Sequence, residues 1–183
     1  MRTFIALEIA KSLQAEIAEM QKALRSCYQE GVRWIEPQNL HITLIFIGKT
    51  NDSERRLISQ ELAKLSREFQ PIIFQIEQLE FIPRVKPRIL WLKLIPQDIE
   101  AKKLYQKACN SLLNMGIRLD FKEPQFHITL ARIKKRLPNI NPNHFLTAEL
   151  IKQKIEIEKL ALLESKLSSA GANYFPLEKF SLR

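Results

Sequence analysis

The tetrapeptide His41-Ile42-Thr43-Leu44 recurs without change as His127-Ile128-Thr129-Leu130. The chain has only three His and five Thr, so two His-x-Thr pairs would arise by accident roughly once in several hundred such sequences. A single pair of this kind is ordinarily structural. The repetition argues that the two tetrapeptides are equivalent parts of a duplicated unit and that their polar side chains share a function.

Each tetrapeptide is expected to lie in a β-strand, because β-branched and aromatic residues are frequent in 40–47 and 126–133. Residues two positions apart in a strand project to the same face. His41 is therefore predicted to lie beside Thr43, and His127 beside Thr129. The Ile and Leu of each motif project to the opposite face and pack against helices.

On either side of these strands, apolar residues that step by four and three predict helices over about 11–28, from Asn51 to the residue before Pro71, and over 98–115. A helix over 143–152 is also expected. The stretch between Gly31 and residue 40 is interpreted as a linker. Further strands are predicted over 3–9, 72–82, 88–95, 155–164 and 173–182.

The order strand-helix-strand-helix-strand thus appears twice, with one extra strand in the second copy. No Pro/Gly/Ser-rich linker separates the copies, so residues 1–183 are predicted to form a single domain with two duplicated lobes, approximately 1–85 and 86–183. The fold class is α+β with mainly antiparallel pairing. If a pseudo-two-fold relates the lobes, the two His-Thr pairs face each other across one central groove.

Two His and two Thr around a groove suit phosphoester hydrolysis. One imidazole can take a proton from water while the other gives a proton to the leaving oxygen, since histidine titrates near pH 6.5. The Thr hydroxyls can donate hydrogen bonds to phosphate oxygens. Arg132, further along the second predicted strand, is expected on the same face as Thr129, where its guanidinium can bind phosphate or nucleotide.

Other candidate residues carry weaker signals. Zinc needs closer ligand clusters than this sequence offers, so no metal and no cofactor is predicted. His144 lacks the His-x-Thr spacing and is interpreted as a surface or helix-end residue. Trp34 precedes the first motif and is a candidate groove-lining, substrate-binding residue, although a core position is the alternative. Cys27 and Cys109 stand alone and are interpreted as ordinary thiols.

Composition narrows the class of partner. The 183 residues contain 29 Lys plus Arg against 20 Asp plus Glu, a net charge of +9, which favours RNA, DNA or phosphorylated small molecules. The basic residues cluster in two places, Arg84, Lys86 and Arg88, and Arg132, Lys134, Lys135 and Arg136. No apolar run approaches the roughly 18 residues of a membrane span, and no export signal is evident. The sequence therefore predicts a cytoplasmic protein without a membrane partner, and no obligate protein partner is evident.

At the two motifs the sequence resembles the 2H phosphoesterase superfamily, and within it the RNA 2′,3′-cyclic phosphodiesterases, also called the LigT or 2′-5′ RNA ligase family. The resemblance covers nearly the whole chain. It is carried by the segments Arg2–Glu8, Val32–Leu44 with Phe46 and Gly48, Pro87–Trp91, His127–Arg132, and Leu163–Leu167 with Gly171 and Tyr174.

The resemblance implies a bilobal fold around a water-filled groove and hydrolysis of a terminal ribose 2′,3′-cyclic phosphate to a 2′-phosphate without metal. It also implies reversible 2′-5′ joining of RNA ends. By analogy His41 is the proton donor and His127 the proton acceptor, although the identical motifs alone cannot order these roles. The implied partners are RNA or tRNA ends, and we expect a monomer.

Two alternatives stay open on the sequence alone. The chain can be a non-catalytic RNA-binding protein on the same scaffold, although binding would not require two titratable imidazoles. It can also be a phosphodiesterase for another cyclic phosphate, such as an ADP-ribose derivative.

Overall fold

The protein is described by a computed structural model that covers residues 1–28, 30–119, 124–135, 141–168 and 171–183. Arg136 of the second basic cluster lies outside these residues. The strands of the described ranges are β1 (Arg2–Glu8), β2 (Val32–Trp34), β3 (His41–Lys49), β4 (Ile72–Ile82), β5 (Ile89–Pro96), β6 (His127–Ile133), β7 (Lys154–Ile157), β8 (Lys159–Ser168) and β9 (Gly171–Ser181).

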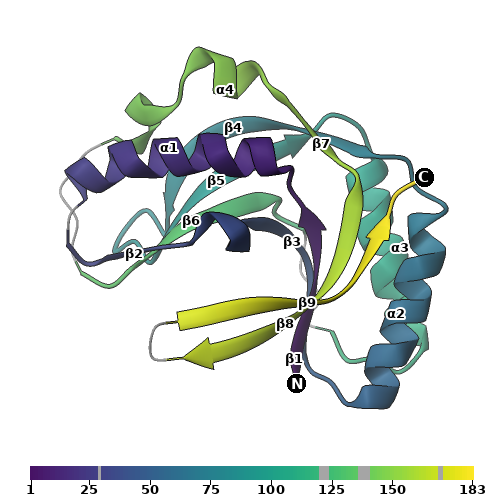
Figure 1. Cartoon of the computed structure of the whole chain (residues 1–183). Coiled ribbons are helices and arrows are strands. Elements are labelled where there is room, and N and C mark those ends of the chain that lie inside the picture. Colours follow the sequence, from purple (N-terminus) through teal and green to yellow (C-terminus); the bar gives the residue numbers. More distant parts are fainter. Residues whose placement is uncertain (29, 120–123, 136–140, 169–170) are drawn as a thin grey trace.

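The described helices are α1 (Lys11–Cys27), α2 (Asp52–Ser66), α3 (Glu100–Asn114) and α4 (Ala148–Lys152), with the short 3₁₀ turns η1 (Pro37–Asn39) and η2 (Pro142–Phe145). Figure 1 shows α2 and α3 side by side at one end of the molecule, away from α1 and α4. None of the described helices has the length and apolar character needed to cross a membrane.

All described strands join one curled sheet in the order β7-β4-β5-β6-β3-β1-β8-β9, with β2 added beside β6. Every described pairing is antiparallel, as predicted. The order is symmetric about the β6–β3 boundary, so that β5 corresponds to β1 and β4 to β8. The motif strands β3 and β6 therefore lie at the centre of the sheet.

The two halves of the sequence interleave in this sheet. Strand β4 comes from the first half but lies between β5 and β7 of the second half. Strands β8 and β9 come from the second half and extend the sheet beyond β1. The description of residues 1–183 as a single domain with lobes at 1–85 and 86–183 stays a prediction about the sequence repeat.

The helices begin and end for local reasons. The apolar face predicted for α1 is buried, with Leu13, Ile17 and Leu24 all inside the core. Helix α2 starts with a capping box, in which the Asn51 side chain accepts from Glu54 N at 2.9 Å and Glu54 Oε2 accepts from Asn51 N at 2.8 Å. Such reciprocal caps satisfy two amide groups that the helix itself leaves unbonded.

Three predicted elements were wrong in detail. The linker before the first motif contains β2, whose partner β6 is about a hundred residues away, so no local pattern marks it. The helix expected over 143–152 is divided into η2 and α4, because the Thr147 side chain caps a new helix by accepting from Leu150 N. The strand expected over 155–164 is two strands, since β7 pairs with β4 and β8 with β1.

Candidate active site

The two motifs lie along one groove with a volume of about 460 Å³. Strands β3 and β6 are neighbours, and Ile42 lies opposite Ile128 in their pairing. Both isoleucines are fully buried. The alternation of the strands therefore turns the polar positions of each motif outward, and the groove is lined by His41, Thr43, His127, Thr129 and Arg132. The structure thus brings together five of the six predicted site residues; the remaining one, Trp34, lies beside this groove.

His41 is held in one orientation by hydrogen bonds to both ring nitrogens. Nδ1 lies 2.7 Å from the carbonyl oxygen of Asn39, to which it donates, and Nε2 lies 3.1 Å from Thr43 Oγ1. In the neutral imidazole Nε2 then accepts from the threonine hydroxyl. The ring also contacts two aromatic side chains, Phe4 at 5.1 Å and Tyr174 at 4.9 Å between centroids, the latter edge-on.

His127 repeats this geometry on the other motif strand. Its Nδ1 lies 2.6 Å from the carbonyl oxygen of Gln125, which is again the residue two positions earlier. One aromatic neighbour, Trp91 of β5, packs on the imidazole with 4.1 Å between ring centroids. The indole is itself fixed, because Trp91 Nε1 donates to Glu80 Oε1 at 2.9 Å. In both histidines Nδ1 is occupied by a carbonyl, which leaves Nε2 for proton transfer.

Burial lowers the pKa of both imidazoles. For His41 the pKa falls to about 4, chiefly by burial and further by the charge of His127, against a smaller raising effect of the Asn39 carbonyl. The pKa of His127 is also lowered by burial, and the hydrogen bond to Gln125 opposes this shift. Because the two charges repel, the pair favours having at most one imidazolium at a time.

Arg132 reaches the groove for a different reason from the one expected. It lies three residues beyond Thr129, so regular alternation would turn it to the opposite face. The pairing of β6 with β5 slips by one residue at this point and leaves Leu130 as an extra residue. This bulge returns Arg132 to the face of Thr129. Arg132 therefore lies on the expected face only because of the bulge, since a regular strand would have placed it on the other face.

The first motif strand carries the same irregularity. The pairing of β3 with β1 slips at the position of Leu44, which is equivalent to Leu130. Phe46 therefore lines the groove as Arg132 does, and its side chain is 64% exposed. The duplicated backbone thus presents an aromatic ring at one position and a cation at the equivalent one. Phe46 is not among the site residues predicted from the sequence.

A buried glutamine supports the second bulge. Gln21 of α1 is 2% exposed, and its Nε2 donates to the carbonyl oxygens of Ile35 and Leu130 at 2.9 and 3.0 Å. The Leu130 carbonyl also accepts from Ile35 N at 2.8 Å. Gln21 is not among the functional residues predicted from the sequence. The available signal was a polar residue four positions after Ile17, on the apolar face of the helix.

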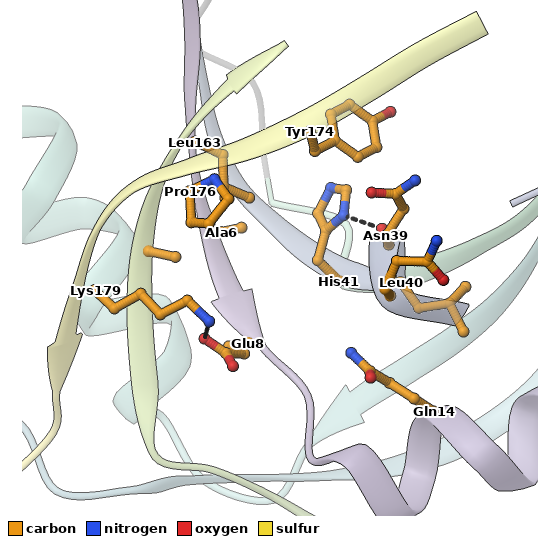
Figure 2. Close-up of a pocket in the computed structure, with 12 residues that line it drawn as sticks. Ala6, Glu8, Gln14, Asn39, Leu40, His41, Leu163, Tyr174, Pro176 and Lys179 are labelled. Carbon is orange, nitrogen blue, oxygen red and sulfur yellow. Dashed lines mark hydrogen bonds and ion pairs between the residues drawn. The ribbon is translucent and has the colours of Figure 1, made fainter. Parts of the chain in front are cut away.

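A smaller pocket of about 90 Å³ adjoins His41, and Asn39, His41 and Tyr174 line both this pocket and the groove. Figure 2 shows His41 next to Tyr174 and the Asn39 carbonyl, with the ion pair of Lys179 and Glu8 in another part of the same pocket. The Lys179 Nζ and Glu8 Oε2 atoms are 2.8 Å apart. The hairpin β8–β9 therefore supplies one wall beside His41.

The remaining candidates lie elsewhere. Trp34 lines a neighbouring hollow of about 450 Å³, is half-buried against the core and has the Arg25 guanidinium 5.7 Å above its ring. His144 is exposed in η2. Cys27 and Cys109 are free thiols. Among the described residues, no group of three or more His, Cys, Asp or Glu side chains is placed to hold a metal ion.

Known proteins with similar sequences are phosphoesterases. Residues 7–91 match the family described as LigT like Phosphoesterase. An RNA 2′,3′-cyclic phosphodiesterase of Archaeoglobus fulgidus is 27% identical over 98% of this chain and 99% of its own. Another, of Aquifex aeolicus, is 29% identical over 99% of this chain and 97% of its own.

Solved structures share the fold. The crystal structure of TT0787 of Thermus thermophilus has a TM-score of 0.87 and 27% identity, and the match covers 100% of this chain and 98% of that one. Escherichia coli LigT in its apo form has a TM-score of 0.74 and 21% identity over 99% and 96% of the two chains, a likeness of fold alone.

A curled antiparallel sheet of this kind, with these relatives, defines a phosphodiesterase enzyme. Over residues 7–91 the chain is similar to LigT-like phosphoesterases, and over its whole length it shares the fold of TT0787.

Proposed function

We propose that this phosphodiesterase hydrolyses the 2′,3′-cyclic phosphate at an RNA end to a 2′-phosphate, without metal, by proton transfer at His41 and His127. One observation carries the proposal, which is the presence of two equivalent His-Thr pairs on adjacent strands of a single groove. The relatives named RNA 2′,3′-cyclic phosphodiesterase support the choice of substrate.

The reaction needs two proton transfers on opposite sides of phosphorus. A base takes a proton from water as its oxygen bonds to phosphorus, and an acid protonates the ribose 3′ oxygen as the P–O3′ bond breaks. The Nε2 atoms of the two histidines serve as these groups, since each Nδ1 is engaged by a carbonyl. The product keeps the phosphate on the 2′ oxygen.

The remaining groove residues hold the phosphate. The Thr43 and Thr129 hydroxyls donate to non-bridging oxygens, where negative charge grows in the transition state. To do so Thr43 exchanges its present hydrogen bond to His41 Nε2 for one to phosphate. Arg132 supplies a guanidinium at the same face. Trp34 lies in the adjoining hollow, where it can contact a nucleoside of a longer substrate.

The family resemblance assigns His41 as proton donor and His127 as proton acceptor, and we retain that order. The protein's own electrostatics oppose it, because a pKa of about 4 favours the neutral form of His41. An anionic phosphate beside the ring raises that pKa and so favours the imidazolium.

A substrate with sulfur in place of the 3′ oxygen distinguishes the two assignments of proton donor and proton acceptor, since a thiolate leaves without an acid. It should restore activity to His41→Ala and not to His127→Ala. Rescue of His127→Ala instead would reverse the assignment.

The regiochemistry tests the proposal directly. Adenosine 2′,3′-cyclic phosphate held in one orientation gives a single product, so digestion followed by separation of 2′-AMP and 3′-AMP should show 2′-AMP. Predominant 3′-AMP would mean the opposite orientation in the groove, and a mixture would mean that the phosphate clamp is not rigid. If the enzyme hydrolyses neither this compound nor an RNA end that carries a 2′,3′-cyclic phosphate, the proposed substrate class is wrong. An ADP-ribose cyclic phosphate is then the next compound to assay.

The same two proton transfers can serve an RNA 5′-hydroxyl in place of water. Its oxygen bonds to phosphorus as its proton passes to the base, and the P–O3′ bond breaks as the acid protonates the 3′ oxygen, which leaves a 2′-5′ diester. Incubation of a cyclic-phosphate oligonucleotide with a 5′-hydroxyl oligonucleotide should then yield a 2′-5′ linked product. Its absence at high oligonucleotide concentration would restrict the enzyme to hydrolysis.

A further inference from the structure

Two arginines face each other across the pairing of β2 with β6. In this register Arg33 lies directly opposite Arg132, and residues directly opposite in an antiparallel pair project to the same face. Like charges in that position repel and destabilise the pairing. Within the described part of the chain, neither guanidinium forms an ion pair with a carboxylate. A bound anion between them would relieve the repulsion.

The pair lies where the groove opens into the neighbouring hollow. Arg33 lines this hollow, and Arg132 lines both the hollow and the groove. The two volumes, about 450 and 460 Å³, also share Ile35, Asn39 and Ala172, so they adjoin each other.

The charge of the hollow is unbalanced. Its described lining includes the three cations Arg25, Arg33 and Arg132 and the single carboxylate of Glu36, which is exposed. The hollow is therefore suited to a second anionic group of the molecule that occupies the groove.

The distance along β6 fits a chain of nucleotides. A strand rises about 3.3 Å per residue, so Arg132 is at most about 10 Å from Thr129, which lies at the proposed site of the cyclic phosphate. A free nucleoside cyclic phosphate has no second phosphate at that distance. An oligonucleotide has one, the linkage on the 5′ side of its terminal ribose.

We propose that Arg33, with Arg132 shared between the two phosphates, binds the internucleotide phosphate that precedes the cyclic end, so that the enzyme acts on RNA ends in preference to free nucleotides. This inference rests on the proposed function. Guanidinium groups bind phosphate oxygens through paired charge-assisted hydrogen bonds. Because both arginines are accessible from solvent, the expected contribution to kcat/KM is moderate, about tenfold.

The test compares a dinucleotide with a mononucleotide. Adenylyl-adenosine ending in a 2′,3′-cyclic phosphate should have a kcat/KM about tenfold above that of adenosine 2′,3′-cyclic phosphate. Replacement of the internucleotide phosphate by an uncharged methylphosphonate should abolish this advantage. Arg33→Ala should reduce the dinucleotide-to-mononucleotide ratio to the same extent and cause no further loss on the methylphosphonate. Arg33→Lys should retain part of the ratio, since it keeps the charge but not the paired donors.

The matched control is Arg56→Ala, which removes the same charge from an exposed position on α2. It should leave the ratio at the wild-type value. Equal losses on both substrates in Arg33→Ala would overturn the proposal, as would a methylphosphonate that keeps the advantage.

A binding measurement separates this inference from the proposed function. A fluorescein-labelled dinucleotide with a 2′-phosphate is titrated with wild type and Arg33→Ala at several salt concentrations. The variant should bind about tenfold more weakly, with a slope of log K against log salt that is smaller by about 0.7. If wild type hydrolyses no cyclic phosphate, the proposed function fails, while this titration still decides the subsite. Unchanged affinity and slope would exclude it.

Discussion

The two motif histidines have identical local sequences but different surroundings. His41 contacts Phe4 and Tyr174, whereas His127 is packed against Trp91, whose indole is fixed by Glu80. These neighbours come from strands β1, β9, β5 and β4. Each is far along the chain from the histidine that it surrounds, and the sheet brings them together. The chemical difference between the two imidazoles is therefore a property of the tertiary structure.

Removal of either imidazole should reduce turnover strongly. His41→Ala and His127→Ala should each lower kcat by about 10²- to 10⁴-fold, which is the usual contribution of a general acid or base. This corresponds to roughly 3 to 5 kcal/mol of transition-state stabilisation. His144→Ala, at an exposed position in η2, is the control and should match wild type. Near-normal kcat in either motif variant, measured with adenosine 2′,3′-cyclic phosphate, would refute the two-histidine mechanism.

The lowered pKa of His41 also predicts how stability changes with pH. The unfolded chain binds a proton on this side chain near pH 6.5, whereas the folded protein does so only near pH 4. The unfolded state therefore binds more protons between these values, and acidification destabilises the fold. From pH 7 to pH 5 this one group should cost about 2 kcal/mol.

Urea denaturation of wild type and His41→Asn at both pH values measures this effect. The variant should lose about 2 kcal/mol less than wild type over the same interval, because it lacks the titrating group. Equal losses in the two proteins would mean that His41 titrates normally in the folded state. His144→Ala serves again as the control and should follow wild type.

At the scale of elements, the two motif strands depart from regularity at the same place. A regular strand predicts the positions of His41, Thr43, His127 and Thr129 correctly, because these lie two residues apart. It fails for Arg132, which reaches the groove only through the bulge at Leu130. A bulge is set by pairing with a neighbouring strand and by the groups that satisfy its carbonyl, so the strand's own sequence did not reveal it.

Gln21 is the side chain on which this bulge depends, and its replacement should show both a structural and a functional effect. Gln21→Leu leaves the partly buried Ile35 carbonyl without the Gln21 donor and removes one of two donors to the Leu130 carbonyl. A loss of about 2 kcal/mol in the free energy of unfolding is expected. Because the bulge orients Arg132, KM for a cyclic-phosphate oligonucleotide should also rise.

The control for this substitution is Lys22→Ala, one residue further along α1. Lys22 forms an exposed ion pair with Glu19, and such pairs contribute about 0–1 kcal/mol. Denaturation curves and steady-state kinetics of the three proteins are the measurements. Wild-type stability in Gln21→Leu would show that the two carbonyls have another donor.

At the scale of the whole molecule, the pseudo-symmetric sheet creates the groove. The motif strands β3 and β6 meet at its centre, and the two sequence halves extend it in an interleaved order. The basic hairpin between β4 and β5 carries Arg84, Lys86 and Arg88, and Arg88 O accepts from Ile133 N just beyond Arg132. Arg88 of the first basic cluster therefore lies close to Arg132 of the second, which lines the groove.

Metal removal tests the mechanism at this scale. If proton transfer by two imidazoles and charge stabilisation by Thr43, Thr129 and Arg132 account for the chemistry, activity should be unchanged after dialysis against EDTA. Steady-state rates before and after dialysis, with and without added Zn²⁺ or Mn²⁺, are the measurement. Loss of activity in EDTA with recovery on either metal would replace the two-histidine mechanism by metal-assisted hydrolysis.

The sequence by itself determined the motif strands, the α+β class and the placement of each His beside its Thr on one face of the strand. These depend on short-range periodicity and residue type, which act within a few positions along the chain. Only the tertiary structure decided the interleaved strand order, the short strand β2, the bulge that turns Arg132 into the groove, and the burial that lowers the pKa of His41. Each of these arises from contacts between residues far apart in the chain, and no local pattern encodes such contacts.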